Sequence, residues 1–172
     1  VQTCALPISA HFAIGASKVI VTGRSWLKSG AEMTVVGLGE ALLTPTRLYV
    51  KSCLKAIPLG IKALAHITGG GLIENIPRVL PDGTKAVLDA ARWTLPPVLK
   101  WLATAGRVPA DEMTRTFNCG LGMIAVVAPA NAAAVRDALT QAGETVFEVG
   151  RIESSPGKAT SEVRGIADAW RA

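Results

Sequence analysis

Hydrophobic positions recur at helical spacing in some stretches of the chain and at strand spacing in others, with glycine or proline at the breaks. Helical spacing predicts helices over residues 38–43, 46–57, 72–80, 96–106, after 109, and 131–143. Short apolar or alternating runs predict strands over residues 63–67, from 86, 122–128 and 145–152, then a loop at 154–157 and a tail with a strand and a short helix. Strands that alternate with helices of this length predict an α/β layer structure, in which helices cover a mixed β-sheet.

The predicted helix over residues 46–57 has two distinct faces. Thr46 stands where an N-terminal cap is expected, and Pro58 and Gly60 end the helix. One face is apolar: Val50, Leu54 and Ile57. Another face carries basic residues four apart: Arg47, Lys51 and Lys55. Such a basic stripe is typical of a solvated helix face, and an anion-facing stripe is the alternative.

The strongest local motif is His66-Ile-Thr-Gly-Gly-Gly-Leu72, at the junction of a predicted strand and a predicted helix. Consecutive glycines allow positive φ angles and a close approach of a ligand, and they expose amide N–H groups. The following helix adds the positive end of its dipole, so phosphate is the natural ligand of Thr68, Gly69, Gly70 and Gly71. No Lys-Ser/Thr follows, so this is not a Walker A loop. A tight strand–helix turn without a ligand is the alternative.

Polar side chains next to the glycines are candidate substrate ligands: His66, Asn75, Arg78 and Asn118. Asn75 and Arg78 are three residues apart, so one helix face can present both to a ligand of the loop. An exposed pair between Arg78 and Glu74 is the alternative. His66 is expected to be a buried histidine with satisfied hydrogen bonds rather than a ligand or base. Asn118 opens Asn118-Cys-Gly-Leu-Gly122, for which a bulge or a close packing turn is the alternative.

Composition and charge narrow the possible partners. The chain has 172 residues, a net charge of +5 and 49% hydrophobic residues, which excludes a disordered tail. Residues 1–62 carry seven basic and two acidic side chains, whereas residues 63–172 carry eleven of each. Aromatic residues make up only 5% and do not interleave with Lys or Arg. We therefore expect phosphorylated small molecules rather than nucleic acid as partners.

Cysteine, histidine and hydropathy patterns exclude other classes. Cys4, Cys53 and Cys119 are scattered, and His11 stands far from His66, so we expect neither a metal site nor a disulfide framework. A reducing cytoplasm is the expected location. Residues 116–135 carry no charge, but glycine, asparagine and proline interrupt them, so we predict no transmembrane helix and no membrane partner.

The first 36 residues contain no motif that indicates a function. Residues 1–8 resemble the in-frame translation of a sequencing-library adapter, and they lack the basic start of a signal peptide. Residues 9–36 include one apolar run typical of a strand, at 19–22. We therefore expect one domain over residues 37–172 and treat residues 1–36 as an uncertain or artefactual segment.

Three motifs in order resemble one known family. They are Leu38-Gly-Glu-Ala-Leu-Leu-Thr-Pro-Thr-Arg-Leu-Tyr-Val50, Ala65-His-Ile-Thr-Gly-Gly-Gly-Leu-Ile-Glu-Asn-Ile-Pro-Arg78 and Arg115-Thr-Phe-Asn-Cys-Gly-Leu-Gly-Met123. Together they resemble the C-terminal domain of the phosphoribosylformylglycinamidine cyclo-ligases, or AIR synthetases, from about Gly37 to Ile152. The resemblance implies the fold of that domain.

The resemblance also implies an activity. Members of the family use ATP and Mg²⁺ to activate the amide oxygen of formylglycinamidine ribonucleotide. Ring closure by an internal nitrogen then gives aminoimidazole ribonucleotide, ADP and phosphate in de novo purine (IMP) biosynthesis. Positioning and charge neutralisation should dominate such catalysis. The intact enzyme is expected to be a homodimer.

The chain departs from the family pattern at its start. The N-terminal domain, which supplies much of the nucleotide site and the dimer interface in the family, is absent, and the glycine-rich segment expected upstream of Leu38 is not recognisable. We therefore assign no catalytic residue and expect this chain alone to be inactive. The alternatives are another ATP-using member of the superfamily, of formylglycinamidine synthase or selenophosphate synthetase type, or a phosphate- or nucleotide-binding module without chemistry.

Overall fold

The computed structural model describes residues 45–170, and the part from Arg47 onward forms a unit of its own. The strand predicted at 19–22, the helix predicted at 38–43 and the whole of the segment 1–36 lie outside the described residues.

Helices and strands alternate along the described part, as the hydrophobic pattern predicts. The helices are α4 (Val50–Ala56), α5 (Gly71–Asn75), α6 (Pro97–Ala105), α7 (Ala110–Thr116), α8 (Ala132–Gln141) and α9 (Ile166–Ala169). The strands are β1 (Ile61–His66), β2 (Thr84–Asp89), β3 (Met123–Val127), β4 (Gly150–Ser154) and β5 (Thr160–Arg164). Short 3₁₀ turns follow α4 and α5, at Ile57–Leu59 and Pro77–Val79.

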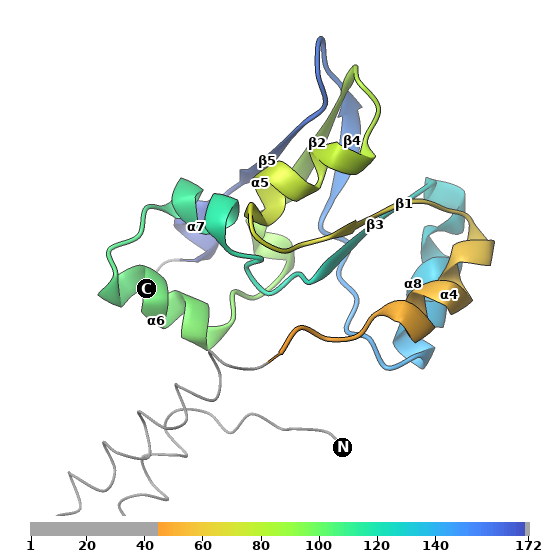
Figure 1. The fold of residues 1–172 in the computed structure, drawn as a ribbon, viewed down its shortest axis with the longest axis horizontal. Coiled ribbons are helices and arrows are strands. Elements are labelled where there is room, and N and C mark those ends of the chain that lie inside the picture. The colour runs from red at the N-terminus through yellow and green to blue at the C-terminus, as the bar shows by residue number, and fades with distance from the viewer. Residues whose placement is uncertain (1–44, 171–172) are drawn as a thin grey trace, which may run out of the picture. The chain divides into compact units, whose positions relative to one another are not determined.

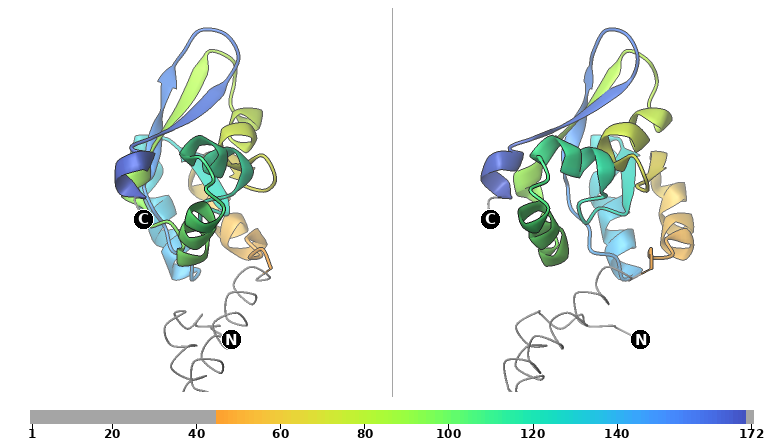
Figure 2. Two further views of the ribbon diagram at one scale, coloured as in Figure 1. Left: turned by 90° about the vertical axis from the view of Figure 1, so that its left-hand side faces the viewer. Right: turned by 60° about the vertical axis from the view of Figure 1, so that its left-hand side comes forward.

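The strands form two separate sheets (Figure 1). β1 and β3 make an antiparallel ladder in which His66 lies opposite Met123. In the second sheet β2 is central, antiparallel to β4 and parallel to β5, so this sheet is mixed. The connection from β4 to β5 extends beyond the neighbouring helices in both further views (Figure 2). The α/β fold class is confirmed, with the strands divided between two sheets.

The core lies between the second sheet, α5, α7 and the segment around Trp93. Its fully buried members include Leu72 and Ile76 from the α5 region and Met113 from α7. Trp93 packs edge to face against Trp170, with ring centroids 5.3 Å apart. A buried apolar cluster of this kind is the main source of the stability of the unit.

The helix predicted over 46–57 differs from the structure at its start. It begins at Val50 after Tyr49, without a side-chain cap, so the prediction that Thr46 caps it is wrong. The apolar face is exposed in this unit: Leu54 is 63% exposed and Val50 is 65% exposed. The helix instead buries its small face, Ser52, Cys53 and Ala56, which contacts α8.

Two other elements differ from their predicted bounds. The helix predicted over 72–80 breaks after Asn75, because Pro77 lacks an N–H and disfavours helical backbone at the residue before it. The strand predicted over 145–152 begins only at Gly150, where pairing with β2 starts. Alternation of side chains alone does not show where a strand finds its partner.

The remaining elements confirm the predictions. α6 starts at Pro97 and ends at Ala105, with Gly106 at its C-cap position, and α7 follows Pro109. α8 follows Asn131 at its cap position, although the Asn131 side chain makes no cap hydrogen bond. Across the described residues, we find no helix with the length and apolar character needed to cross a membrane.

Candidate functional site

The glycine motif connects the end of β1 to the start of α5. Gly70 and Gly71 both have positive φ angles, of 95° and 54°, which L side chains rarely adopt. A Cβ added to Gly71 would collide with the backbone carbonyl oxygen of Thr114 and lie 2.8 Å from the carbonyl carbon of Arg115. Gly69 has no atom within 4 Å of an added Cβ, so this glycine faces open space. The loop therefore rests on α7 at one end and is open at the other.

The Asn75 side chain supports this loop by hydrogen bonds to its carbonyl oxygens. Its side chain is 5% exposed, and its amide nitrogen donates to the carbonyl oxygens of Thr68, Gly69 and Gly71 at 3.3, 3.2 and 2.8 Å. The carbonyls of Thr68, Gly69 and Gly71 are therefore directed toward the buried Asn75 side chain. Within the described part of the chain, the amides of Thr68, Gly69 and Gly70 donate to no protein acceptor. Backbone amides without a protein acceptor are the groups that can bind an anion.

Arg78 lies beside the same asparagine. Its guanidinium donates to Asn75 Oδ1 at 3.2 Å and lies 3.9 Å from the Glu74 carboxylate. The exposed Glu74–Arg78 pair that the spacing allows is therefore present, and Arg78 also contacts Asn75 directly. Asn75 supports the loop rather than pointing outward, whereas the Arg78 side chain is 63% exposed.

His66 and Asn118 lie at the same end of the β1–β3 ladder as the loop, since β1 ends where β3 begins. The Ile67 amide donates to the Gly122 carbonyl at 3.0 Å, which ties the two motifs together. His66 is exposed, so the expectation of a buried histidine is wrong; its ring meets Tyr49 edge to face at 6.1 Å. Burial raises the pKa of the Tyr49 hydroxyl, and the Glu144 carboxylate adds to that rise.

The Asn118 motif forms a close turn, as its alternative interpretation predicts. Asn118 Oδ1 accepts from the Gly120 amide at 3.0 Å, and Cys119 and Gly120 have φ angles of 51° and 91°. The Cys119 carbonyl accepts from Trp93 Nε1 at 3.0 Å, and burial raises the pKa of the Cys119 thiol to about 12. Cys119 is therefore a structural residue and not a nucleophile. The Asn118 side chain is exposed beside the loop.

Sequence reasoning missed Tyr49 as a neighbour of the site. A Cβ at Gly122 would collide with the Tyr49 hydroxyl, so the absence of a side chain at Gly122 makes room for the ring. Tyr49 lies in the first of the three ordered motifs and Gly122 in the third. Their membership of these motifs was the only sign in the sequence that they belong near the site.

The class of protein that this arrangement defines is an α/β domain with a glycine loop between β1 and α5. A family model described as AIR synthase related protein, C-terminal domain, matches residues 8–161, and the chain belongs to this family. The match starts at residue 8 and so includes residues 9–36; a domain boundary at residue 37 stays a prediction.

A curated relative gives the comparison more detail. The phosphoribosylformylglycinamidine cyclo-ligase of Aromatoleum aromaticum (strain DSM 19018 / LMG 30748 / EbN1) is 55% identical over 120 residues. The aligned part is 68% of this chain and 34% of that protein, so the chain spans about a third of the length of the relative. The family resemblance of the three motifs is confirmed.

Proposed function

We propose that this chain is the C-terminal domain of an ATP-dependent cyclo-ligase that converts formylglycinamidine ribonucleotide to aminoimidazole ribonucleotide, with release of ADP and phosphate. Membership of the family and the identity of the relative as a phosphoribosylformylglycinamidine cyclo-ligase support the proposal. The intact enzyme would act in purine biosynthesis in the cytoplasm as a homodimer. Formylglycinamidine synthase and selenophosphate synthetase types stay the alternatives within the superfamily.

One observation carries the role of this domain. Asn75 draws the carbonyls of the triglycine loop inward, and the amides of Thr68, Gly69 and Gly70 are left without protein acceptors in the described residues. Such amides bind phosphate oxygens without a charged side chain, and Arg78 stands close enough to Asn75 to add a positive charge. We assign the loop to a phosphate group of the ribonucleotide or of ATP. The five residues of α5 contribute little dipole, so the loop amides do most of the binding.

ATP and Mg²⁺ fit this domain unequally. The loop amides suit the phosphates of ATP, which would supply the phosphoryl group that activates the substrate amide. A Mg²⁺ ion needs carboxylate ligands in addition to phosphate oxygens, and the described residues contain no group of three metal-ligating side chains. This part of the chain therefore does not provide a metal site by itself, and the role of its residues is to bind and orient the phosphate.

The 172-residue chain alone is expected to be inactive. Among the described titratable groups near the loop, His66, Glu74, Arg78 and Arg115 are exposed, and Tyr49 is half-buried. Ring closure requires a site that excludes water from the activated amide, and exposed side chains on one open loop do not provide it. We assign no catalytic residue to the described part of the chain.

A coupled assay of the full-length protein tests the proposal. ADP release that depends on formylglycinamidine ribonucleotide is the expected result, and Asn75→Ala should lower kcat/KM because the loop loses its support. Absence of turnover in the full-length protein would refute the cyclo-ligase proposal. If phosphate binding persisted without turnover, the domain would be a binding module instead. Turnover by the 172-residue chain itself would contradict its predicted inactivity.

A further inference from the structure

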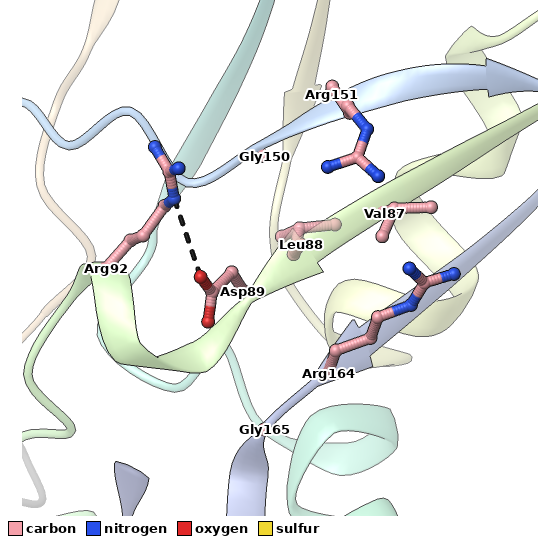
Figure 3. Close-up of a pocket in the computed structure, with 8 residues that line it drawn as sticks. All are labelled: Val87, Leu88, Asp89, Arg92, Gly150, Arg151, Arg164 and Gly165. Carbon is pink, nitrogen blue, oxygen red and sulfur yellow. Dashed lines mark ion pairs between the residues drawn. The ribbon is translucent and has the colours of Figure 1, made fainter.

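A second concave surface lies on the three-stranded sheet, away from the triglycine loop. It is a cavity of about 400 Å³, and its charged lining consists of Arg92, Arg151, Arg164 and Asp89, with Val87 and Gly165 between them. Figure 3 shows the Arg151 and Arg164 side chains on either side of β2 and the Arg92 side chain beyond the end of that strand. The lining itself carries three guanidinium groups and one carboxylate, and two further carboxylates, of Glu153 and Glu162, lie next to it.

The register of the strands explains why these side chains gather. Val87 of β2 lies opposite Arg151 of β4 and Glu162 of β5, and Asp89 lies opposite Arg164. Residues opposite each other, and residues two apart on one strand, share a face of the sheet. Arg151, Arg164 and Asp89 therefore belong to a single face.

The triglycine loop belongs to the other face. Ser161, adjacent to Glu162 on β5, donates its hydroxyl to the carbonyls of Leu72 and Ile73 in α5, at 2.9 and 3.0 Å. Because neighbouring residues of a strand point to opposite faces, α5 and its loop pack on the face that Ser161 occupies. A ligand held by the three arginines would therefore be separated from the loop by the sheet itself.

Each arginine is held by a carboxylate that a stronger anion can replace. Arg92 lies 3.6 Å from Asp89, and it also donates to the Glu148 carbonyl at 3.2 Å. Arg151 lies 2.5 Å from Glu153, and Arg164 lies 2.5 Å from Glu162, which also pairs with Lys85. The arginine side chains are 55–68% exposed, and ion pairs at such positions are weak. A phosphate group offers two negative charges and matches the guanidinium fork with paired oxygens.

We propose that this arginine pocket is a binding site for a small phosphomonoester that carries hydroxyl groups, distinct from the triglycine loop. The guanidinium groups of Arg92, Arg151 and Arg164 receive the phosphate. Asp89 accepts from the Ala91 amide and retains lone pairs for a ligand hydroxyl, which favours a sugar phosphate over a bare anion. The cavity volume falls in the range of sites for small ligands.

Calorimetric titration of the 172-residue chain with ribose 5-phosphate at low ionic strength tests this site. Arg151→Gln and Arg164→Gln should each weaken binding about tenfold or more, because each removes a charge-assisted hydrogen bond to phosphate. Glu162→Gln should strengthen binding severalfold, because it frees Arg164 and Lys85 from their present partner. Arg47→Gln is the matched control, since Arg47 has a similar exposure, 57%, and pairs with Glu144 at 2.9 Å.

Two further arms separate this site from the loop and identify its ligand. Gly70→Val distorts the triglycine loop and should leave the affinity of the pocket unchanged within twofold. Ribose without phosphate should not bind. Asp89→Asn should weaken the binding of ribose 5-phosphate more than the binding of inorganic phosphate. Binding that is abolished by Gly70→Val but insensitive to both arginine substitutions would overturn the pocket and leave the loop as the site. Absence of any binding by the native chain would also overturn it.

Discussion

The three glycines of the triglycine loop differ in burial and in backbone conformation, although the sequence shows three identical residues. Gly71 is buried against the α7 backbone, Gly70 has a φ of 95°, and Gly69 is exposed with open space around its Cα. Only the neighbours that α7 brings to the loop distinguish them. The sequence therefore predicts the loop but not which glycine is required for packing.

Gly71→Ala is expected to destabilise the domain by about 2–4 kcal/mol, because its Cβ would overlap the Thr114 carbonyl and the φ of 54° is strained for alanine. Gly69→Ala is the matched control and should change the free energy of unfolding by less than about 0.5 kcal/mol. Urea denaturation of both variants measures the difference. Equal destabilisation by the two substitutions would show that the loop does not pack on α7 as described.

His66 and Asn75 show how far residue-level reasoning reaches. Their place beside the glycines is correct, because chain connectivity alone puts them there. Their orientation is set by tertiary contacts: Asn75 turns to the loop carbonyls, and His66 at the end of β1 lies exposed against Tyr49. Neither orientation follows from sequence spacing.

At the scale of elements, α4 is where the hydrophobic pattern misleads. The apolar side chains of Val50, Leu54 and Ile57 recur at helical spacing, yet the helix packs on α8 through smaller residues. Hydrophobic periodicity identifies an apolar helix face, but it does not show whether other residues of the same unit pack against that face. The chain positions of α6, α7 and β3, by contrast, follow directly from their prolines, glycines and apolar runs.

Leu54→Ala on α4 is expected to change the free energy of unfolding by less than about 0.5 kcal/mol, because the side chain is already 63% exposed. Leu72→Ala is the matched substitution at a side chain that is 0% exposed, and it should cost about 2–5 kcal/mol. Thermal and urea unfolding of the two variants provide the comparison. A loss from Leu54→Ala as large as that from Leu72→Ala would mean that this face of α4 is covered in solution.

The β2–β5 pair makes a separate prediction about pH. Hydrogen bonding from Lys85, with a further contribution from Arg164, lowers the pKa of Glu162 below its usual value of 4.5. The unfolded chain therefore takes up this proton at a higher pH than the folded chain. The stabilisation is fully present above the unfolded-state pKa, and it is lost as pH falls through the lower folded-state pKa.

Urea midpoints of the native chain and Glu162→Gln, measured between pH 6 and pH 3, check this pH dependence. The native chain should lose stability relative to the variant only below about pH 4.5. A constant difference across the whole range would show that the Lys85 and Arg164 contacts do not favour the ionised carboxylate.

For the whole molecule, the ordered motifs predict the family, and the family model and the relative confirm it. The second and third motifs meet in space because β1 and β3 pair antiparallel, which places His66 of the second motif opposite Met123 of the third. The arginine pocket could not be predicted in the same way. Asp89 and Arg92 lie far along the chain from Arg151 and Arg164, and the register of β2 with β4 and β5 brings the two segments together.

The central claim is that the triglycine loop of this domain holds a phosphate group. Two-dimensional ¹H–¹⁵N NMR of the 172-residue chain, titrated with ATP and in parallel with ribose 5-phosphate, tests it most directly. The account predicts saturable downfield shifts of the Gly69 and Gly70 amide protons with at least one of these ligands, and their loss in Asn75→Ala. Saturable shifts elsewhere in the domain, with the amides of Gly69 and Gly70 unchanged by both ligands, would contradict the account.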